Sequence, residues 1–494
     1  FSGIVANGSE LYVSGTLFDQ KNMPFATRIL AADGTVDTAN YGIEGFQQVS
    51  YATGNAFALS MSLDSGKGMW IPGYVEAGSS KSMTISAFDS NGDRYNTNDI
   101  VDGKNTLTRS SLYSDDSAVE IIQIQSGAQV GKYLTTSIAD DATNQYIILT
   151  RLSSAGQLDS TFDIDGHKEL KIGTSATVKG MFELSTGNFI IYGNVTEVAK
   201  TNGFIARIDQ NGLLDISFGD NGIYTTSAIT STNIKFNHVK VDSLNRLIAV
   251  GNFENSNISA FVLRLNNNGE LDTLFNTGVN SGYIVGANTD DYLTVEIDAS
   301  DNIFAGGNRD IGDKDMLVVK YLAAGLLDNE QTIDMSPSSD DSVQKLIFDT
   351  NNDLLWIGSG SGFLSPITLE VAKTTQSGEL VTSFSGDGKA SYSMSVLGDT
   401  IVKDASIDGN NNIIVAGSGE ILGNSGYLIG RIKANGAVDT TFDNNGYYIE
   451  LNCSSSASVE SIILLNNSSF VAAGQCYQGA TEKNNINISH YKLN

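Results

Sequence analysis

The sequence predicts an all-β protein, a β-propeller of about eight to nine repeats of roughly 57 residues, each with four short antiparallel strands. Two observations predict this class. Short alternating apolar runs are separated by Asn-Gly, Asp-Gly and Ser-Gly turns, and the 494 residues include 51 Gly but only 4 Pro. The same order of strands and turns also recurs along nearly the whole chain, whereas helical spacing of apolar residues is rare.

A pair of glycines marks each repeat. An apolar strand is expected to end in the first Gly, and a second apolar strand with a basic residue leads to a turn Gly, as in Gly251 and Gly269. Eight such pairs occur, with Ser137 in the first slot of one pair. The turn glycines from Gly34 to Gly436 give a period of about 57 residues, nearer to a kelch repeat than to a WD40 blade. A β-solenoid is the main rival, but its coils are usually shorter.

A second signature follows most of the turn glycines. It consists of Leu or Val, then Asp, then Phe three residues after the Asp. The pairs are Asp159 and Phe162, Asp215 and Phe218, Asp272 and Phe275, and Asp439 and Phe442. We expect the Asp to bond backbone N–H groups at a corner of the chain and the Phe to fill the core beneath it.

A basic residue recurs at one slot of the repeat. It is found at Arg28, Arg151, Arg207, Arg264, Lys320, Lys373, Arg431 and Lys492. A ring of such cations could bind an anionic ligand, but each could also pair with the corner Asp, as Arg207 with Asp215 or Arg264 with Asp272. We favour the structural interpretation, because a role repeated in every unit usually belongs to the scaffold.

The segments from Arg207 to Phe218 and from Arg264 to Phe275 resemble the delta-60 repeat family of bacterial secreted or surface proteins. The segments from Arg151 to Phe162 and from Arg431 to Phe442 carry the resemblance equally well. It covers nearly the whole chain and weakens between about residues 35 and 130. The resemblance implies a propeller-like fold and an extracytoplasmic setting, and it brings no catalytic residues.

We expect a single repeat domain over residues 1–494, with degenerate repeats at 35–130 and regular repeats at 131–494. Residues 1–34 should hold about three strands of an incomplete first unit. Residues lost upstream would explain this, and so would an open edge that recruits a strand from a neighbour. The chain begins at Phe1 without an initiator Met, so we expect a processed chain or a fragment.

Charge excludes two classes of partner. The chain has 29 Lys+Arg against 56 Asp+Glu, a net charge of −27, which repels phosphate backbones and anionic lipid. No apolar run approaches the roughly 20 residues needed to cross a bilayer. We therefore expect neither nucleic-acid binding nor membrane insertion.

Candidate chemistry is sparse. His167, His238 and His490 occupy different repeat phases, which argues against a zinc site or a nucleophilic triad. Asp-rich turns such as 163–166, 443–446 and 89–93 offer oxygen ligands, yet none completes a calcium loop. We therefore favour plain hairpin turns at these positions. No cofactor other than calcium is expected. Cys453 and Cys476 are candidates for a disulfide in the last unit, with two buried thiols as the alternative.

These observations predict a non-catalytic extracellular or cell-surface protein with a structural or adhesive role. Its partner would be a second copy of itself, in a filament or surface lattice, or a cell-surface glycan or protein. The alternative is a secreted glycosidase or lyase that uses acidic residues of the propeller channel or of the degenerate region. A clustered pair of carboxylates with raised pKa values would favour the enzyme.

Overall fold

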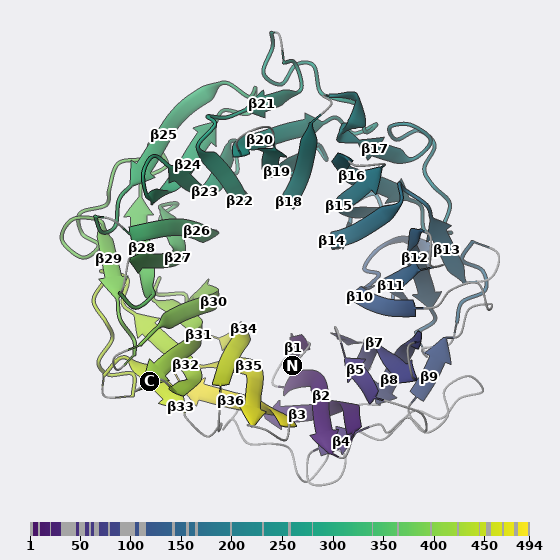
Figure 1. The fold of residues 1–494 in the computed structure, drawn as a ribbon, viewed down its shortest axis with the longest axis horizontal. Coiled ribbons are helices and arrows are strands. Elements are labelled where there is room, and N and C mark those ends of the chain that lie inside the picture. The colour runs from purple at the N-terminus through teal and green to yellow at the C-terminus, as the bar shows by residue number, and fades with distance from the viewer. Residues whose placement is uncertain are drawn as a thin grey trace. The chain divides into compact units, whose positions relative to one another are not determined.

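A computed structural model describes most of the chain as β-strands and turns (Figure 1). The described residues are 3–7, 10–19, 21–30, 46–48, 55–58, 61–63, 69–77, 80–88, 104–107, 115–140, 144–154, 158–163, 166–197, 200–229, 232–254, 258–278, 280–337, 339–362, 365–395, 398–421, 424–443, 445–450, 456–466, 469–478 and 483–492. Two short 3₁₀ helices, Gly127–Gln129 and Thr226–Ala228, are the helical elements among them. No helix in these ranges is long and apolar enough to cross a membrane.

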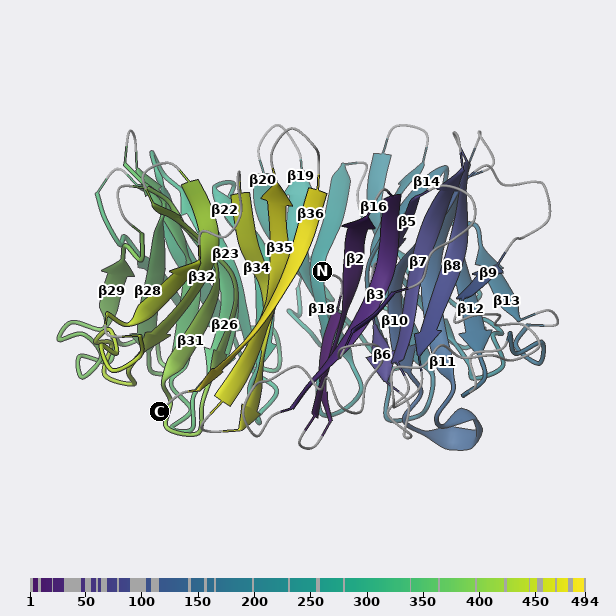
Figure 2. The same cartoon turned by 90° about the horizontal axis from the view of Figure 1, so that it is seen from below.

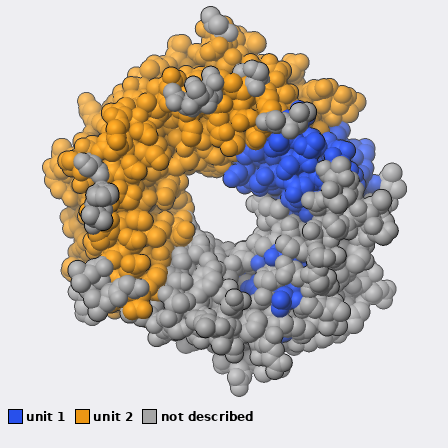
Figure 3. Space-filling view, in the orientation of Figure 1, with its two compact units in different colours: residues 1–199, 205–215, 468–492 blue, residues 200–204, 216–467, 493–494 orange. Residues whose placement is uncertain are grey.

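The chain divides into two compact units, coloured separately in Figure 3. Unit 1 contains residues 1–199, 205–215 and 468–492, and unit 2 contains residues 200–204, 216–467 and 493–494.

The strands form antiparallel sheets of consecutive strands. The first sheet contains β1 (Gly3–Asn7), β2 (Glu10–Asp19), β3 (Lys21–Leu30) and β4 (Phe46–Gln48). The second has nine strands: β5 (Asn55–Ala58), β6 (Ser62–Leu63), β7 (Met69–Ala77), β8 (Ser80–Phe88), β9 (Lys104–Leu107), β10 (Asp115–Gln123), β11 (Tyr133–Asp140), β12 (Gln145–Leu152) and β13 (His167–Leu170). A single parallel pairing, Asp115 with Lys81, joins β5–β9 to β10–β13, so this sheet holds two repeats.

Five four-stranded sheets follow in chain order. The third sheet contains β14 (Ser175–Glu183), β15 (Phe189–Glu197), β16 (Lys200–Ile208) and β17 (Ile223–Thr225), and the fourth contains β18 (Asn233–Val241), β19 (Leu247–Glu254), β20 (Ile258–Leu265) and β21 (Tyr283–Val285). The fifth contains β22 (Asp290–Ile297), β23 (Ile303–Asp310), β24 (Lys314–Tyr321) and β25 (Leu327–Ile333), and the sixth contains β26 (Ser339–Phe348), β27 (Leu354–Gly362), β28 (Thr368–Thr374) and β29 (Lys389–Tyr392). The seventh contains β30 (Thr400–Ile407), β31 (Ile413–Ile421), β32 (Asn424–Ile432) and β33 (Tyr447–Glu450). Figure 2 shows β31 and β32 side by side. The last sheet has three strands: β34 (Ser456–Asn466), β35 (Ser469–Gln478) and β36 (Lys483–Lys492).

The first sheet extends beyond the residues that the sequence analysis assigned to the incomplete first unit. Residues 1–34, expected to hold about three strands of an incomplete unit, contain β1–β3, and these pair with β4 at Phe46–Gln48 to make a four-stranded sheet. Among the described residues, β34–β36 form a sheet of three strands. The short outermost strand of each four-stranded sheet comes after the turn and corner that end the repeat, so β4 lies beyond residue 34.

The recurring strand glycine lies inside its strand, and the expectation that it ends the strand is wrong. Gly251 lies opposite Phe236 in the middle of β19, which continues to Glu254. The partner strand bulges directly after Phe236, so its backbone comes very close to the glycine. A Cβ on Gly251 would overlap the backbone oxygen of Lys235. Gly193, Gly307, Gly358 and Gly417 are each opposite the same kind of bulge.

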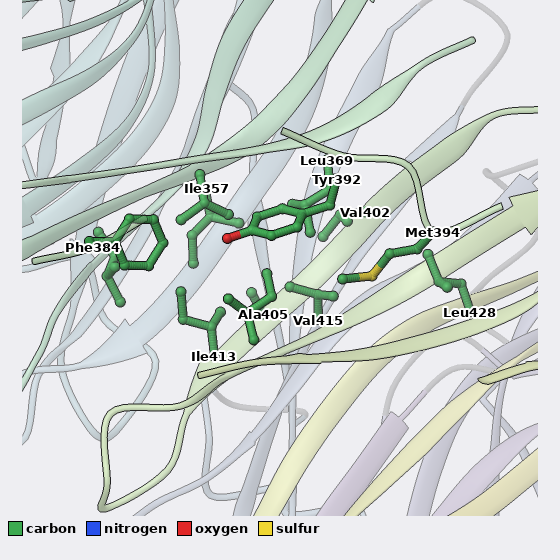
Figure 4. Close-up of a cluster of buried hydrophobic side chains, with 13 residues drawn as sticks. Ile357, Leu369, Phe384, Tyr392, Met394, Val402, Ala405, Ile413, Val415 and Leu428 are labelled. Carbon is green, nitrogen blue, oxygen red and sulfur yellow. The ribbon is translucent and has the colours of Figure 1, made fainter. Parts of the chain in front are cut away.

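The core lies between the faces of successive sheets, as Figure 4 shows for one cluster in unit 2. Ile357 and Leu369 from β27 and β28 pack there with Val402 and Val415 from β30 and β31. The four side chains are at most 6% exposed. Fully burying each aliphatic side chain contributes about 1.5–3 kcal/mol, so packing between neighbouring repeats is the main source of stability.

Candidate functional site

The recurring basic residues pair with the corner aspartates. Within unit 1, Nε of Arg207 lies 2.8 Å from Oδ2 of Asp215. Within unit 2, Nη2 of Arg264 lies 2.9 Å from Oδ2 of Asp272, and Nη2 of Arg431 lies 2.5 Å from Oδ2 of Asp439. Arg151 and Asp159 repeat this arrangement in unit 1 at 2.7 Å.

The corner ion pairs are shielded from water. Arg264 is 2% exposed and Asp272 8% exposed. Burial alone would raise the pKa of Asp439, but hydrogen bonds from Thr441 and the charge of Arg431 together hold that pKa below its usual value. The Asp439 carboxylate is therefore charged at neutral pH, and it pairs with Arg431 in a buried site.

The corner phenylalanine lies beneath the guanidinium and beneath the next repeat. Arg264 lies 4.6 Å from the ring centroid of Phe275, and Arg431 lies 5.5 Å from that of Phe442. Phe275 also packs against Gly325, the turn glycine of the following repeat, where a Cβ would come within 2.6 Å of the ring. Gly325 has a φ of 81°, so glycine is required there both by the backbone and by the ring.

Hydrogen bonds complete this joint between repeats. Arg264 donates through Nη1 to the backbone oxygen of Ala323 in the next turn. The backbone N–H of Asn276 donates to the oxygen of Ala324 at 2.8 Å. Equivalent backbone bonds join Asp163 to Asn211, Gly219 to Asn268 and Ser385 to Asn435. The recurring Arg, Asp, Phe and turn Gly therefore form one structural arrangement that joins the Arg264 repeat to its successor.

The repeat that contains Lys373 lacks the corner Asp and compensates for it. Val381 stands at that position, and Lys373 pairs instead with Asp349 at 2.7 Å and with Asp353 at 3.3 Å. The basic residue thus keeps a carboxylate partner even where the corner has lost its own.

Other candidates from the sequence are not brought together. Nδ1 of His167 lies 2.8 Å from Oγ1 of Thr150, and Nδ1 of His238 accepts the N–H of Val295 at 3.3 Å. Burial lowers the pKa of His238, which keeps its imidazole neutral. His490 is a residue of β36 whose side chain is not described.

Two further candidates fall at least partly outside the described residues. Cys453 lies there, and Cys476 is in β35 with a side chain that is not described, so the disulfide stays a prediction. The Asp-rich turns at 89–93, 163–166 and 443–446 are also incomplete in, or outside, the described ranges.

A group of carboxylates that the sequence analysis missed lies at one edge of two successive sheets in unit 2. Asp315 is the second residue of β24, Asp334 directly follows β25, and Asp341 is the third residue of β26. One oxygen from each lies within 4.8 Å of the other two. The antiparallel pairing of β24 with β25 explains part of this arrangement, because the start of one strand meets the end of the other.

Glu370, from β28, extends the acidic group. A Cβ on Gly360 would lie between Oδ1 of Asp341 and Oε1 of Glu370, so these two carboxyl groups are close neighbours. Glu370 accepts hydrogen bonds from Thr368 and Ser391, both at 2.5 Å. Burial, followed by the charge of Asp341, raises the pKa of Glu370.

Asp341 and Asp315 are also difficult to ionise. Asp341 accepts the N–H of Met335 at 3.0 Å and the hydroxyl of Ser339 at 2.7 Å, but burial and the charges of Asp334 and Asp315 raise its pKa. Burial and the charge of Asp334 likewise raise the pKa of Asp315. A cation or a hydrogen-bond donor beside these carboxylates would stabilise their ionised form.

A pocket of about 380 Å³ adjoins the carboxylates. Its lining includes Met335, Ser339, Gly360, Glu370 and Ser391. The lining is mostly small and polar and includes Glu370 itself, and the pocket is large enough for water or a sugar-sized group.

The comparisons with known proteins support the fold. A family model described as "Domain of unknown function (DUF5122) beta-propeller" matches residues 245–275 and 409–442. Both matched segments end at a corner Phe, Phe275 in one and Phe442 in the other. None of the curated proteins is similar enough in sequence to match this chain.

Several solved structures are similar in fold at very low identity. Sqt1 from Chaetomium thermophilum is 8% identical with a TM-score of 0.47, and the match covers 100% of this chain and 96% of that one. A eukaryotic initiation factor is 10% identical with a TM-score of 0.47, covering 99% and 97%. The polysaccharide lyase Uly1 is 9% identical with a TM-score of 0.41, covering 76% and 89%.

The repeated antiparallel sheets and the family match confirm the predicted fold class, an all-β fold of the β-propeller type. Both segments matched by the family model contain an Arg–Asp–Phe corner.

Proposed function

We propose that this chain is a non-catalytic, extracellular or cell-surface β-propeller with a structural or adhesive role, related to the delta-60 repeats. The observation that carries the proposal is the use of the recurring residues. Arg264, Asp272 and Phe275 are buried and hold one repeat to the next, so the chemistry repeated along the chain serves the scaffold. Contacts with a partner are then left to side chains on the surface.

Exposed apolar side chains near the corners support a self-associating or adhesive role. Ile216 directly follows the corner Asp215 and is 78% exposed. Leu274 lies two residues after the corner Asp272 and is 75% exposed. Leu327 precedes the Asp of its own repeat and is 58% exposed. Recurrence at neighbouring positions of the repeat would present similar contacts several times, which favours multivalent binding to a second copy or to a surface glycan or protein.

Electron microscopy and light scattering of the purified chain across a concentration series test this function. We expect ordered assemblies that the double variant Ile216→Asp/Leu274→Asp disrupts without lowering the melting temperature. Leu244→Asp, at another exposed turn position (61%), is the matched control and should assemble normally. A chain that stays monomeric at high concentration, and that retains no affinity for cell-surface glycans or proteins, would contradict the proposal.

A carbohydrate-active enzyme is the second candidate, because Asp341 and Glu370 are adjacent carboxyl groups beside a pocket. Glycosidases use such pairs as acid and nucleophile or base. The two residues are only 0% and 1% exposed, which is why this candidate ranks second.

Polysaccharide turnover by the full chain tests the enzyme directly. Turnover that Asp341→Asn and Glu370→Gln abolish, but that Glu379→Gln at an exposed position leaves intact, would favour it over a binding role. No turnover above buffer on a broad set of polysaccharides would exclude it.

A further inference from the structure

One carboxylate of the acidic cluster in unit 2 lacks a counterpart. Asp315 is 8% exposed, and within the described residues its carboxylate accepts no hydrogen bond and forms no ion pair. Its oxygen nevertheless lies within 4.8 Å of carboxyl oxygens of Asp334 and Asp341. A buried, unpaired carboxylate that faces two others calls for a positive partner.

Two basic side chains near the cluster are engaged elsewhere. Arg309, which lies opposite Asp315 in the β23–β24 register, instead pairs with Asp290 at 2.6 Å. Lys389 donates through Nζ to the backbone oxygen of Asp334 at 2.7 Å. Neither cation therefore neutralises the Asp315 carboxylate.

Asp315 also departs from the repeat. Asp315 lies five residues before the recurring basic residue Lys320, and Asn202, Ser259 and Thr368 occupy the same position in other repeats. A role confined to one pair of neighbouring sheets is not a scaffold role shared by all of them.

We propose that Asp315, Asp334 and Asp341 together bind one hard divalent cation, and that calcium is the ion that suits them. All three donors are carboxylate oxygens, which calcium prefers, and flexible geometry with added water ligands is typical of its sites. Asp334 is exposed and the pocket beside Ser339 adjoins Asp341, so water can complete the coordination. This site is independent of the proposed structural or adhesive function.

Isothermal titration calorimetry of the full chain, freed of metal with a chelator and titrated with calcium chloride, tests the proposal. We expect one binding event per chain, with weaker binding of magnesium, which demands a stricter octahedral geometry. Asp315→Asn should weaken calcium binding by at least about tenfold. Asp340→Asn is the matched control, because Asp340 neighbours Asp341 but its carboxylate bonds the N–H of Lys314 at 3.0 Å.

Melting temperatures give a second readout that separates loss of ligand from loss of fold. Without metal, Asp315→Asn should melt at or above the wild-type temperature, since it removes an uncompensated charge. Calcium should then raise the melting temperature of the wild type and of Asp340→Asn but not that of Asp315→Asn. No calcium uptake by the wild type at millimolar concentration, or equal uptake by Asp315→Asn, would overturn the proposal.

Discussion

Arg264 shows how much one side chain contributes to the joint between repeats. It pairs with Asp272, covers the ring of Phe275 and donates to the backbone of Ala323 in the next turn. These contacts use the planar, multiply donating guanidinium, which a lysine cannot reproduce. Truncating the residue would leave the Asp272 carboxylate buried without its partner.

We therefore expect Arg264→Ala to destabilise its repeat by about 3–5 kcal/mol, the usual effect of breaking a buried ion pair. Lys433→Ala is the control, because Lys433 is 43% exposed and lies 3.4 Å from Asp439. An exposed pair of this kind contributes about 0–1 kcal/mol. Native-state hydrogen exchange measures each effect locally, in β19–β21 for Arg264→Ala and in β31–β33 for Lys433→Ala. Equal local losses in the two variants would contradict this account.

Acid should weaken the corners through their aspartates. The folded-state pKa of Asp439 lies below its unfolded value, so its contribution to stability is present above about pH 4 and is lost as the pH falls through the folded pKa. Asp439→Asn should thus lower the melting temperature at pH 7 and make progressively less difference toward pH 2. A difference from wild type that stays constant over this range would mean that Asp439 acts only through its shape and hydrogen bonds.

At the scale of the element, the paired strands β22 and β23 depend on a bulge and a glycine. Gly307 lies opposite Tyr292, after which β22 bulges. A Cβ there would overlap the backbone oxygen of Asp291. The neighbouring Gly306 is different, since a Cβ would first meet Cδ1 of Leu346, a flexible side chain, at 3.0 Å.

Gly307→Ala should accordingly destabilise the protein by about 1–3 kcal/mol, because the strands must separate to admit the methyl group. Gly306→Ala should cost less, since the Leu346 side chain can rotate. Thermal unfolding of both variants provides the comparison. The interpretation fails if the two substitutions have the same effect.

At the scale of the whole molecule, the dominant feature is the net charge of −27. Like charges spread over the surface destabilise the compact state, and salt screens them over a distance of about 10 Å at 0.1 M ionic strength. The corner ion pairs are buried and are screened much less.

We expect the melting temperature to rise between 10 mM and 150 mM sodium chloride. The reason is that the Debye length falls from about 30 Å to about 8 Å over this range, so the repulsion between surface charges is screened. Choline chloride at equal ionic strength should have the same effect, which distinguishes screening from sodium binding. A melting temperature that falls with salt would show that exposed ion pairs outweigh the repulsion.

The sequence by itself determined the repeat, the all-β class and the pairing of basic residue with corner Asp, as in Arg207 and Asp215. These features follow from local rules: turn glycines adopt positive φ, and the ion-pair partners are eight residues apart. The tertiary structure decided that Gly251 lies opposite a bulge and that Asp315, Asp334 and Asp341 meet. These acids come from different strands of two sheets, so only strand register and the packing of one sheet on the next bring them together.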